Sequence, residues 1–380
     1  MARSVILMVA SCCFLLSGCS GIKNIQDLTY IVSIGMDYDE EKEEYTVYLQ
    51  GLNFLNVAKQ EGGKSAEPVP IFVASAKGET LNLAVRKLYK VSEPPLYFGH
   101  VKTLVITNRI VQHKFQEVVE EIGKNRSIRP TLHVVTTEEG IEEVLNTNAL
   151  FNYPAVYTVL FKKDAYEVAQ NEIRPVALMN FLREYYEPMN AAKLPSVKID
   201  KTSWKADKDY PVLYFDGYSV FQNRKYMKEL AFEDSLFLNW LMEKYIAVDE
   251  RVDVEGKLAA AVKLESPRLK IKYDEDSSSP KFSIDLSIRA DVLEKVQDIS
   301  MNRLTSLVEE EIKAKLRTLY LDGVENKIDY LNAGEKWFRM HPEKFAELEK
   351  TGNFYLEKDS LTDIKVKVQV FNFNSYKYNQ

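Results

Sequence analysis

The chain has all of its cysteines near the amino terminus, and this distribution limits how its body can be stabilised. Cys12, Cys13 and Cys19 are the three cysteines in the sequence of 380 residues. The apolar run from Val5 to Leu16 contains the first two. This run is too short for a membrane-spanning helix, which needs about 20 residues, and has the anatomy of a cleaved export signal. A mature body that keeps Cys19 alone has no disulfide, no cysteine-based zinc site and no cysteine nucleophile, so a hydrophobic core must stabilise it.

The residues at the end of the apolar run indicate a lipid anchor. Leu16-Ser17-Gly18-Cys19 resembles the lipobox of bacterial lipoproteins, in which the cysteine is alkylated with diacylglycerol and the peptide bond before it is cut. We therefore predict a signal peptide at residues 1–18, cleaved after Gly18, with diacylglycerol and an N-acyl chain such as palmitate on Cys19. Two or more acyl chains anchor stably because each buried methylene contributes about 0.8 kcal/mol. An ordinary cleaved signal is the alternative.

Composition excludes some classes of partner. The chain is 46% hydrophobic, and its length predicts more than one core. The net charge of −6 comes without a basic patch, which excludes nucleic-acid binding. The acidic balance also argues against adhesion of the protein surface to anionic lipid, so the lipid on Cys19 remains as the anchor.

Segments typical of strands and helices alternate in the first part of the body, residues 19–200. The runs Tyr30–Met36 and Tyr45–Leu49 are rich in β-branched and aromatic residues and predict a hairpin or meander. The other predicted elements here are strands at 102–106 and 131–135, helices at 81–88 and 115–122, the latter closed by Gly123, and a helix through Ile141 that is capped from Thr137-Glu138-Glu139. The polar stretch 194–210 predicts the boundary to a second domain, residues 201–380.

The second part predicts an antiparallel sheet with packed helices. The expected elements are strands at 213–215, 218–221, 259–264, 268–273, 282–290 and 364–370, a turn at Asp216-Gly217, and a helix through Trp240. From Leu304 to Tyr320 the apolar residues lie on one helical face, which predicts a long amphipathic helix that packs on the sheet or docks a membrane partner. The fold class is therefore α+β, multi-domain, with mixed or antiparallel sheets.

A search for chemistry finds no catalytic constellation and no metal site. The four histidines are scattered, without the spacing that places two imidazoles on one metal. Gly63-Lys64-Ser65 mimics the end of a phosphate-binding loop, but Ala58 stands where the earlier glycine is required. The alternation of Asp37, Asp39 and Glu41 opens like a calcium loop, but Lys42 occupies the position of the turn glycine. These absences favour binding or assembly over catalysis.

Several motifs behind the lipobox carry a resemblance to a known family. They are Ile34-Gly35-Met36-Asp37, Leu96-Tyr97-Phe98-Gly99-His100-Val101-Lys102, Arg126-Ser127-Ile128-Arg129-Pro130, Gly217-Tyr218-Ser219-Val220-Phe221 and Glu335-Lys336-Trp337-Phe338-Arg339-Met340-His341-Pro342. With these motifs in this order, the chain resembles the spore germination protein C family, often called GerAC. The members of that family are the lipoprotein subunits of nutrient germinant receptors. The resemblance spans nearly the whole mature chain.

The resemblance implies a lipid-anchored, non-enzymatic receptor subunit. It implies a multi-domain α+β body on the outer face of the spore inner membrane or cell membrane, beside integral-membrane subunits of the A and B types. It supplies no cofactor other than the lipid on Cys19. It names no nutrient, and it does not say whether this subunit touches one.

Three residues in the motifs are candidates for structural or partner contacts. Gly99 would let the backbone approach a neighbour closely just before a buried strand, and His100 could then link neighbouring loops. Arg126 and Arg129 could pair with carboxylates inside the domain or contact a partner.

Two other functions remain open from the sequence. A solute-binding lipoprotein of the cell envelope would need a deep cleft lined with polar groups. A cell-wall hydrolase would need paired acidic residues in a groove.

Overall fold

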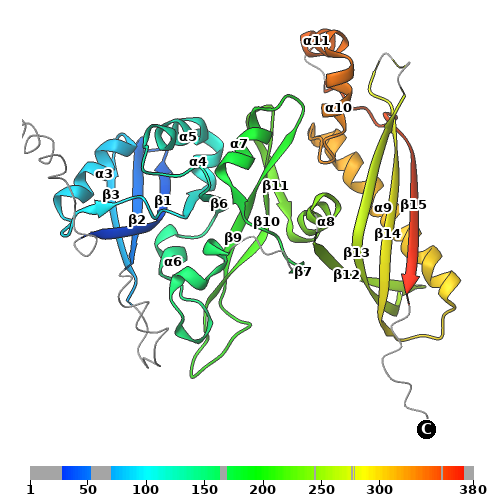
Figure 1. Ribbon diagram of the computed structural model, residues 1–380, viewed down its shortest axis with the longest axis horizontal. Helices are drawn as coiled ribbons and strands as arrows, with labels where there is room; N and C mark the ends of the chain where they lie inside the picture. The colour runs from blue at the N-terminus through cyan, green and yellow to red at the C-terminus, as the bar shows by residue number, and fades with distance from the viewer. Residues whose placement is uncertain are drawn as a thin grey trace, which may run out of the picture.

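The computed structural model describes residues 28–52, 70–162, 169–243, 245–274, 277, 279–351 and 354–371. The predicted signal peptide, the cleavage at Gly18, the lipidation of Cys19 and the loop Gly63-Lys64-Ser65 lie outside these residues. Among the helices that are described, none combines the length and the apolar character needed to cross a membrane. Two sheets lie side by side along the long axis of the molecule (Figure 1).

The first sheet has ten strands and draws on both predicted domains. In spatial order they are β11 (Lys225–Ala231), β10 (Val212–Gln222), β9 (Ala191–Asp200), β6 (His133–Thr137), β5 (Thr103–Thr107), β1 (Thr29–Asp39), β2 (Glu44–Leu52) and β3 (Phe72–Gly78), with β4 (Leu96–Tyr97) beside β1 and β8 (Val176–Ala177) beside β6. The pairing of β1 with β2 confirms the predicted hairpin. Strands β1, β5 and β6 are parallel, so their carboxyl ends lie at one edge.

Helices cover both faces of this sheet, as parallel strands require. On one face lie α3 (Leu81–Lys90), α4 (Asn108–His113), α5 (Phe115–Lys124) and α7 (Leu178–Tyr186), and on the other lie α6 (Ile141–Asn146) and the 3-10 turns η2 (Leu150–Asn152), η3 (Ala155–Tyr157) and η4 (Val159–Phe161). The predicted helices at 81–88 and 115–122 are confirmed. Two details were wrong: α5 continues through Gly123, and α6 begins after Gly140, which provides no side-chain cap.

The stretch predicted as a polar boundary is partly sheet. Residues up to Asp200 form β9, because Leu194 packs in the core on one face of the sheet while Val197 and Ile199 pack in the core on the other. The predicted turn at Asp216-Gly217 is also wrong, since β10 runs through it as one strand. A bulge takes its place: Gly217 has φ of 141°, and a Cβ there would overlap the carbonyl oxygen of Leu230.

The second sheet has five strands, β15 (Leu361–Phe371), β14 (Phe282–Lys295), β13 (Lys257–Tyr273), β12 (Ile246–Val254) and β7 (Ala169–Gln170) in that order. The strands β12, β13 and β14 are antiparallel, as predicted, whereas β15 pairs with β14 in parallel. The two strands predicted at 259–264 and 268–273 form the single strand β13, with an irregularity after Glu265.

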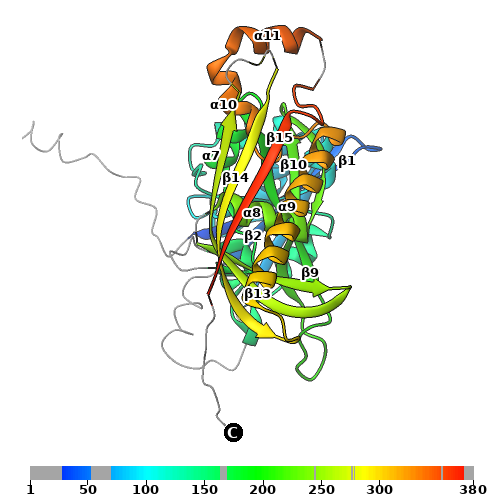
Figure 2. The ribbon, with the colours of Figure 1, turned by 90° about the vertical axis from the view of Figure 1, so that its right-hand side faces the viewer.

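Three helices complete the carboxyl-terminal part. The long helix α9 (Met301–Asn326) packs its buried residues, including Leu304, Val308 and Ile312, against the second sheet beside β15 (Figure 2). Of the two interpretations of this amphipathic segment, packing on the sheet therefore accounts for its apolar face. The helices α10 (Ala333–Met340) and α11 (Pro342–Thr351) follow at one end of the sheet.

Helix α8 (Phe232–Met242) joins the two sheets into one core. Every residue from Ser235 to Leu241 is buried, and a helix that is apolar on all sides must be covered on all sides. It lies between the sheets (Figure 1), and one cluster of buried side chains runs through it from Val220 to Leu264. The α+β fold class is thus confirmed, and the predicted boundary at residue 200 falls between two paired strands, β9 and β10, of one sheet.

Candidate functional site at the strand ends of the first sheet

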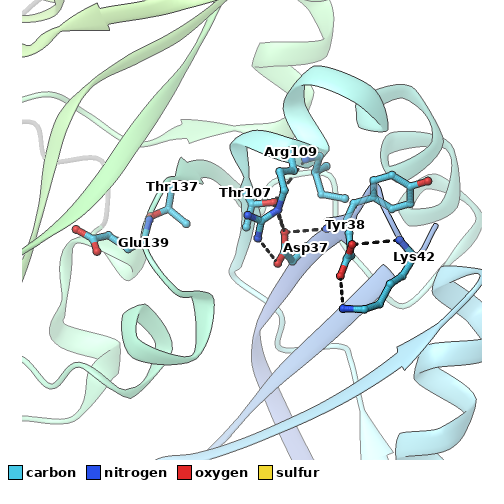
Figure 3. Close-up of polar contacts among 9 residues, drawn as sticks. Asp37, Tyr38, Lys42, Thr107, Arg109, Thr137 and Glu139 are labelled. Atoms are coloured by element: carbon cyan, nitrogen blue, oxygen red, sulfur yellow. Dashed lines mark hydrogen bonds and ion pairs between the residues drawn. The ribbon is translucent and has the colours of Figure 1, made fainter. Parts of the chain in front are cut away.

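The carboxyl ends of β1 and β5 bring together an aspartate, a threonine and an arginine (Figure 3). The Arg109 guanidinium donates from Nε to Asp37 Oδ1 at 3.0 Å and from Nη2 to Oδ2 at 2.6 Å. The Thr107 hydroxyl also donates to Asp37 Oδ1, at 2.7 Å, and Thr107 Oγ1 accepts from Ile110 N at the start of α4. Because the bidentate pair is charge-assisted and linked to a helix cap, it fixes α4 against β1.

An acidic depression opens beside this ion pair. Its volume is about 420 Å³, and it is lined by Asp37, Asp39, Glu40, Glu41, Glu44, Thr46, Tyr48, Lys77 and Arg109. Three of these carboxylates have partners: Asp37 binds Arg109, Asp39 binds Lys42 Nζ at 2.9 Å, and Glu40 Oε1 lies 3.0 Å from His113 Nε2. The hydrogen bond from Lys42 also holds the pKa of Asp39 below its usual value. Within the described residues, no group of three or more His, Cys, Asp or Glu side chains is arranged to bind a metal.

The next strand end along the sheet is held by hydroxyl groups. Thr137, the last residue of β6, donates to the Val197 carbonyl at 2.9 Å. Its hydroxyl oxygen also accepts from Glu139 N at 3.0 Å, and Figure 3 shows these two residues. One residue earlier, the hydroxyls of Thr136 and Ser219 lie 2.7 Å apart, and Ser219 donates to Glu229 Oε1 at 2.6 Å. Hydrogen bonds of buried hydroxyl groups therefore hold the strands together at this edge, where the acidic depression opens.

His100 lies at the opposite edge, where β1 and β5 begin. Its ring meets Tyr30 edge-on at a centroid distance of 5.0 Å and lies 5.6 Å from Tyr97. Burial, followed by the charges of Lys102 and Arg129, lowers the pKa of His100. At the preceding position a Cβ would overlap the Tyr97 ring, so Gly99 permits the close approach that brings His100 to these aromatic rings.

The two candidate arginines do not meet the carboxylates suggested for them. Both side chains are exposed in the connection between α5 and β6, and among the described residues neither has a carboxylate within 4.0 Å. Arg129 is near enough to His100 for its charge to act on that ring, while Arg126 lines a separate cavity between α3 and α5.

A buried aspartate that the sequence analysis missed links the two sheets. Asp329 accepts from Ala333 N at 3.0 Å and from Gly334 N at 2.6 Å, at the start of α10. The Tyr355 hydroxyl lies 2.9 Å both from Asp329 Oδ2 and from the Met189 carbonyl of the amino-terminal part. Burial raises the pKa of Asp329, while the hydrogen bonds from Gly334 N, Ala333 N and the Tyr355 hydroxyl oppose that shift. The available signal was an aspartate just before a helix start.

Comparisons with known proteins agree with the motifs and the fold. A model described as the spore germination protein N-terminal domain matches residues 21–199, and one described as spore germination B3/GerAC like, C-terminal, matches residues 216–374. Spore germination protein KC of Bacillus subtilis (strain 168) is 23% identical over 387 residues, covering 96% of this chain and 93% of that protein. Spore germination protein GerQC of Bacillus cereus is 19% identical, covering 96% of this chain and 98% of that one.

A solved structure supports the fold independently. The crystal structure of the GerBC protein superposes with a TM-score of 0.51 at 14% identity, over 92% of this chain and all of that one. A two-sheet α+β body with these motifs in order defines a spore germination protein. The chain belongs to the GerAC family of spore germination proteins, whose members are germinant receptor subunits.

Proposed function

We propose that this chain is the lipid-anchored subunit of a nutrient germinant receptor and acts without catalysis, by assembly with integral-membrane subunits of the A and B types. Diacylglycerol and an N-acyl chain on Cys19 would hold the body at the outer face of the spore inner membrane or cell membrane. Nutrient-triggered germination would require the assembled receptor.

One observation carries the proposal. The family match begins at residue 21, so the germination-protein body starts directly behind the lipobox cysteine at position 19. A body that starts directly behind a lipidated cysteine is held at the membrane by the lipid, so it needs no membrane-spanning helix of its own. The acidic depression beside Asp37 and Arg109 would receive a cationic loop of a membrane subunit.

The hydrolase alternative fits this depression poorly. Glycoside hydrolysis requires one carboxyl group with a raised pKa facing a second, ionised one. Here Asp37 is paired with Arg109, and the hydrogen bond from Lys42 lowers the pKa of Asp39.

The substitution Cys19→Ala tests the proposal, with Cys13→Ala as the matched control. Loss of the thiol at position 19 should move the chain out of the membrane fraction and abolish germination with nutrients, measured as the fall in optical density of a spore suspension given a panel of amino acids and sugars. Cys13→Ala, inside the predicted signal, should change neither readout. Full nutrient germination by spores whose Cys19→Ala chain is present but not membrane-bound would contradict the proposal.

A further inference from the structure

A cavity separate from the acidic depression lies between α3 and α5, above β1 and β2. Its volume is about 390 Å³, within the range of small-molecule sites and larger than the voids of a close-packed core. The floor is formed by apolar side chains of the two strands and the two helices, among them Met36, Leu49, Val85 and Ile122. Such a floor attracts apolar groups and offers no hydrogen bonds to water.

The rim of the cavity is polar and carries an excess positive charge. Glu121, Lys124 and Arg126 line it, together with Asn82. The Glu121 carboxylate is already engaged, since it accepts from Lys124 Nζ at 2.9 Å and also from the Asn82 amide. Arg126 has no carboxylate within ion-pairing distance in the part of the chain that is described. One guanidinium at the mouth is therefore available to an anion.

This distribution of charge selects the class of ligand. A guanidinium binds a carboxylate through two parallel hydrogen bonds, and an apolar tail behind that carboxylate would fill the floor. A free amino acid would also need a carboxylate for its ammonium group, but Glu121 is committed to Lys124 and Asn82. An amine would meet a rim of its own charge.

We propose that the cavity between α3 and α5 binds a small aliphatic or arylalkyl monocarboxylate, with its carboxylate on Arg126 and its tail against Met36, Leu49, Val85 and Ile122. This inference does not rest on the lipid anchor or on receptor assembly, because every residue it uses lies in the body between β1 and the loop after α5.

Equilibrium dialysis of radiolabelled hexanoate against the full chain as isolated from its producing cells tests the inference. If the isolated chain carries a lipid anchor, it is reconstituted in phosphatidylcholine liposomes, and protein-free liposomes serve as the blank. If it carries none, the dialysis is done in buffer alone. We expect saturable binding of one hexanoate per chain, competition by 3-phenylpropionate, and no competition by hexanamide or norleucine.

Three variants give the matched comparison. Arg126→Gln should weaken hexanoate binding by at least about tenfold, the size expected for a lost charge-assisted hydrogen bond. Arg86→Gln removes the same charge from an exposed position of α3 that does not line the cavity, and it should bind like the parent chain. Val85→Trp should fill the cavity and abolish binding, with circular dichroism confirming that the variant folds.

Any of three results would overturn the inference. They are the absence of saturable hexanoate binding by the parent chain, equal competition by hexanamide, and equal losses in Arg126→Gln and Arg86→Gln. If Val85→Trp fails to fold, the exposed Arg126 and Arg86 positions still decide the question, because their substitution leaves the apolar packing unchanged.

Discussion

At the scale of single residues, the first sheet contains a carboxyl group directed inward from its edge. Glu229 lies in β11, the terminal strand of the sheet, and its Oε1 accepts from the hydroxyls of Ser219, at 2.6 Å, and Tyr226, at 3.3 Å. Burial raises the pKa of Glu229 above its ordinary value of 4.5. An inward-pointing charge on an edge strand discourages pairing with another chain, so this residue trades stability for protection against aggregation.

The raised pKa of Glu229 predicts a pH-dependent loss of stability. A carboxyl group whose pKa is higher in the folded than in the unfolded state stabilises the fold below the unfolded value, 4.5, and loses this contribution as pH rises through the folded value. Glu229→Gln keeps both accepted hydrogen bonds without a charge. We expect it to match the parent chain below about pH 4.5 and to exceed it at neutral pH, in urea midpoints measured across that range.

The exposed Glu294→Gln is the control for this comparison, because it removes one carboxylate without changing a buried group. Its urea midpoints should follow those of the parent chain throughout. A Glu229→Gln difference that grows toward acid, rather than toward neutral pH, would show that the sign is wrong.

At the scale of elements, the contact between β1 and α6 depends on a missing side chain. Gly35 lies in the middle of β1, and a Cβ there would overlap Ile141 Cγ2 of α6 and come within 3.1 Å of Tyr48 Cβ. Gly35→Ala should therefore push α6 away from the sheet and destabilise the chain by about 1–3 kcal/mol, as overpacking of a core does. Urea unfolding followed by far-ultraviolet circular dichroism measures the loss.

A second glycine gives the opposite expectation. Gly123 lies inside α5, and a Cβ there would have no atom within 4 Å. Gly123→Ala should stabilise the chain by up to about 1 kcal/mol, because alanine is the better helix former. Equal effects of the two substitutions would mean that α6 does not pack on β1 as described.

Elements with a clear period were predictable, whereas those set by distant partners were not. The β1–β2 hairpin and α9 follow from alternation and from a helical stripe, both local in sequence. The bulge at Gly217 was interpreted as a turn because aspartate-glycine usually marks one, and only the pairing with β9 on both sides of the bulge shows that the strand continues. Arg109 and Asp37 are 72 positions apart, so no spacing rule could have joined them. His100 lies against the ring of Tyr30, and Arg126 lines the cavity between α3 and α5. Both positions likewise depend on tertiary contacts.

At the scale of the whole molecule, the two parts share their core. Helix α8 is buried between the sheets, and the contact of Tyr355 with Met189 and Asp329 ties the carboxyl-terminal part to the amino-terminal part. Strands β10 and β11 complete the first sheet although they follow residue 200. The family models also meet in this region, between residues 199 and 216, so a boundary between sequence models need not be a boundary between folding units.

Truncation distinguishes these two kinds of boundary. A fragment of residues 20–200 lacks Phe221, whose ring packs on Phe115 at 5.0 Å and on Phe181 at 5.2 Å in the core of the amino-terminal part. It also leaves β9 without its partner β10. A fragment of residues 20–231 restores β10 and β11 without exposing the buried helix α8. We expect the longer fragment to unfold cooperatively in urea with a near-ultraviolet circular dichroism signal, and the shorter one to lose that signal and aggregate, because removing a large buried aromatic side chain alone costs about 3–5 kcal/mol. Cooperative unfolding of the shorter fragment would instead make residue 200 a true domain boundary, with β10 and β11 as an addition to a sheet that is already stable.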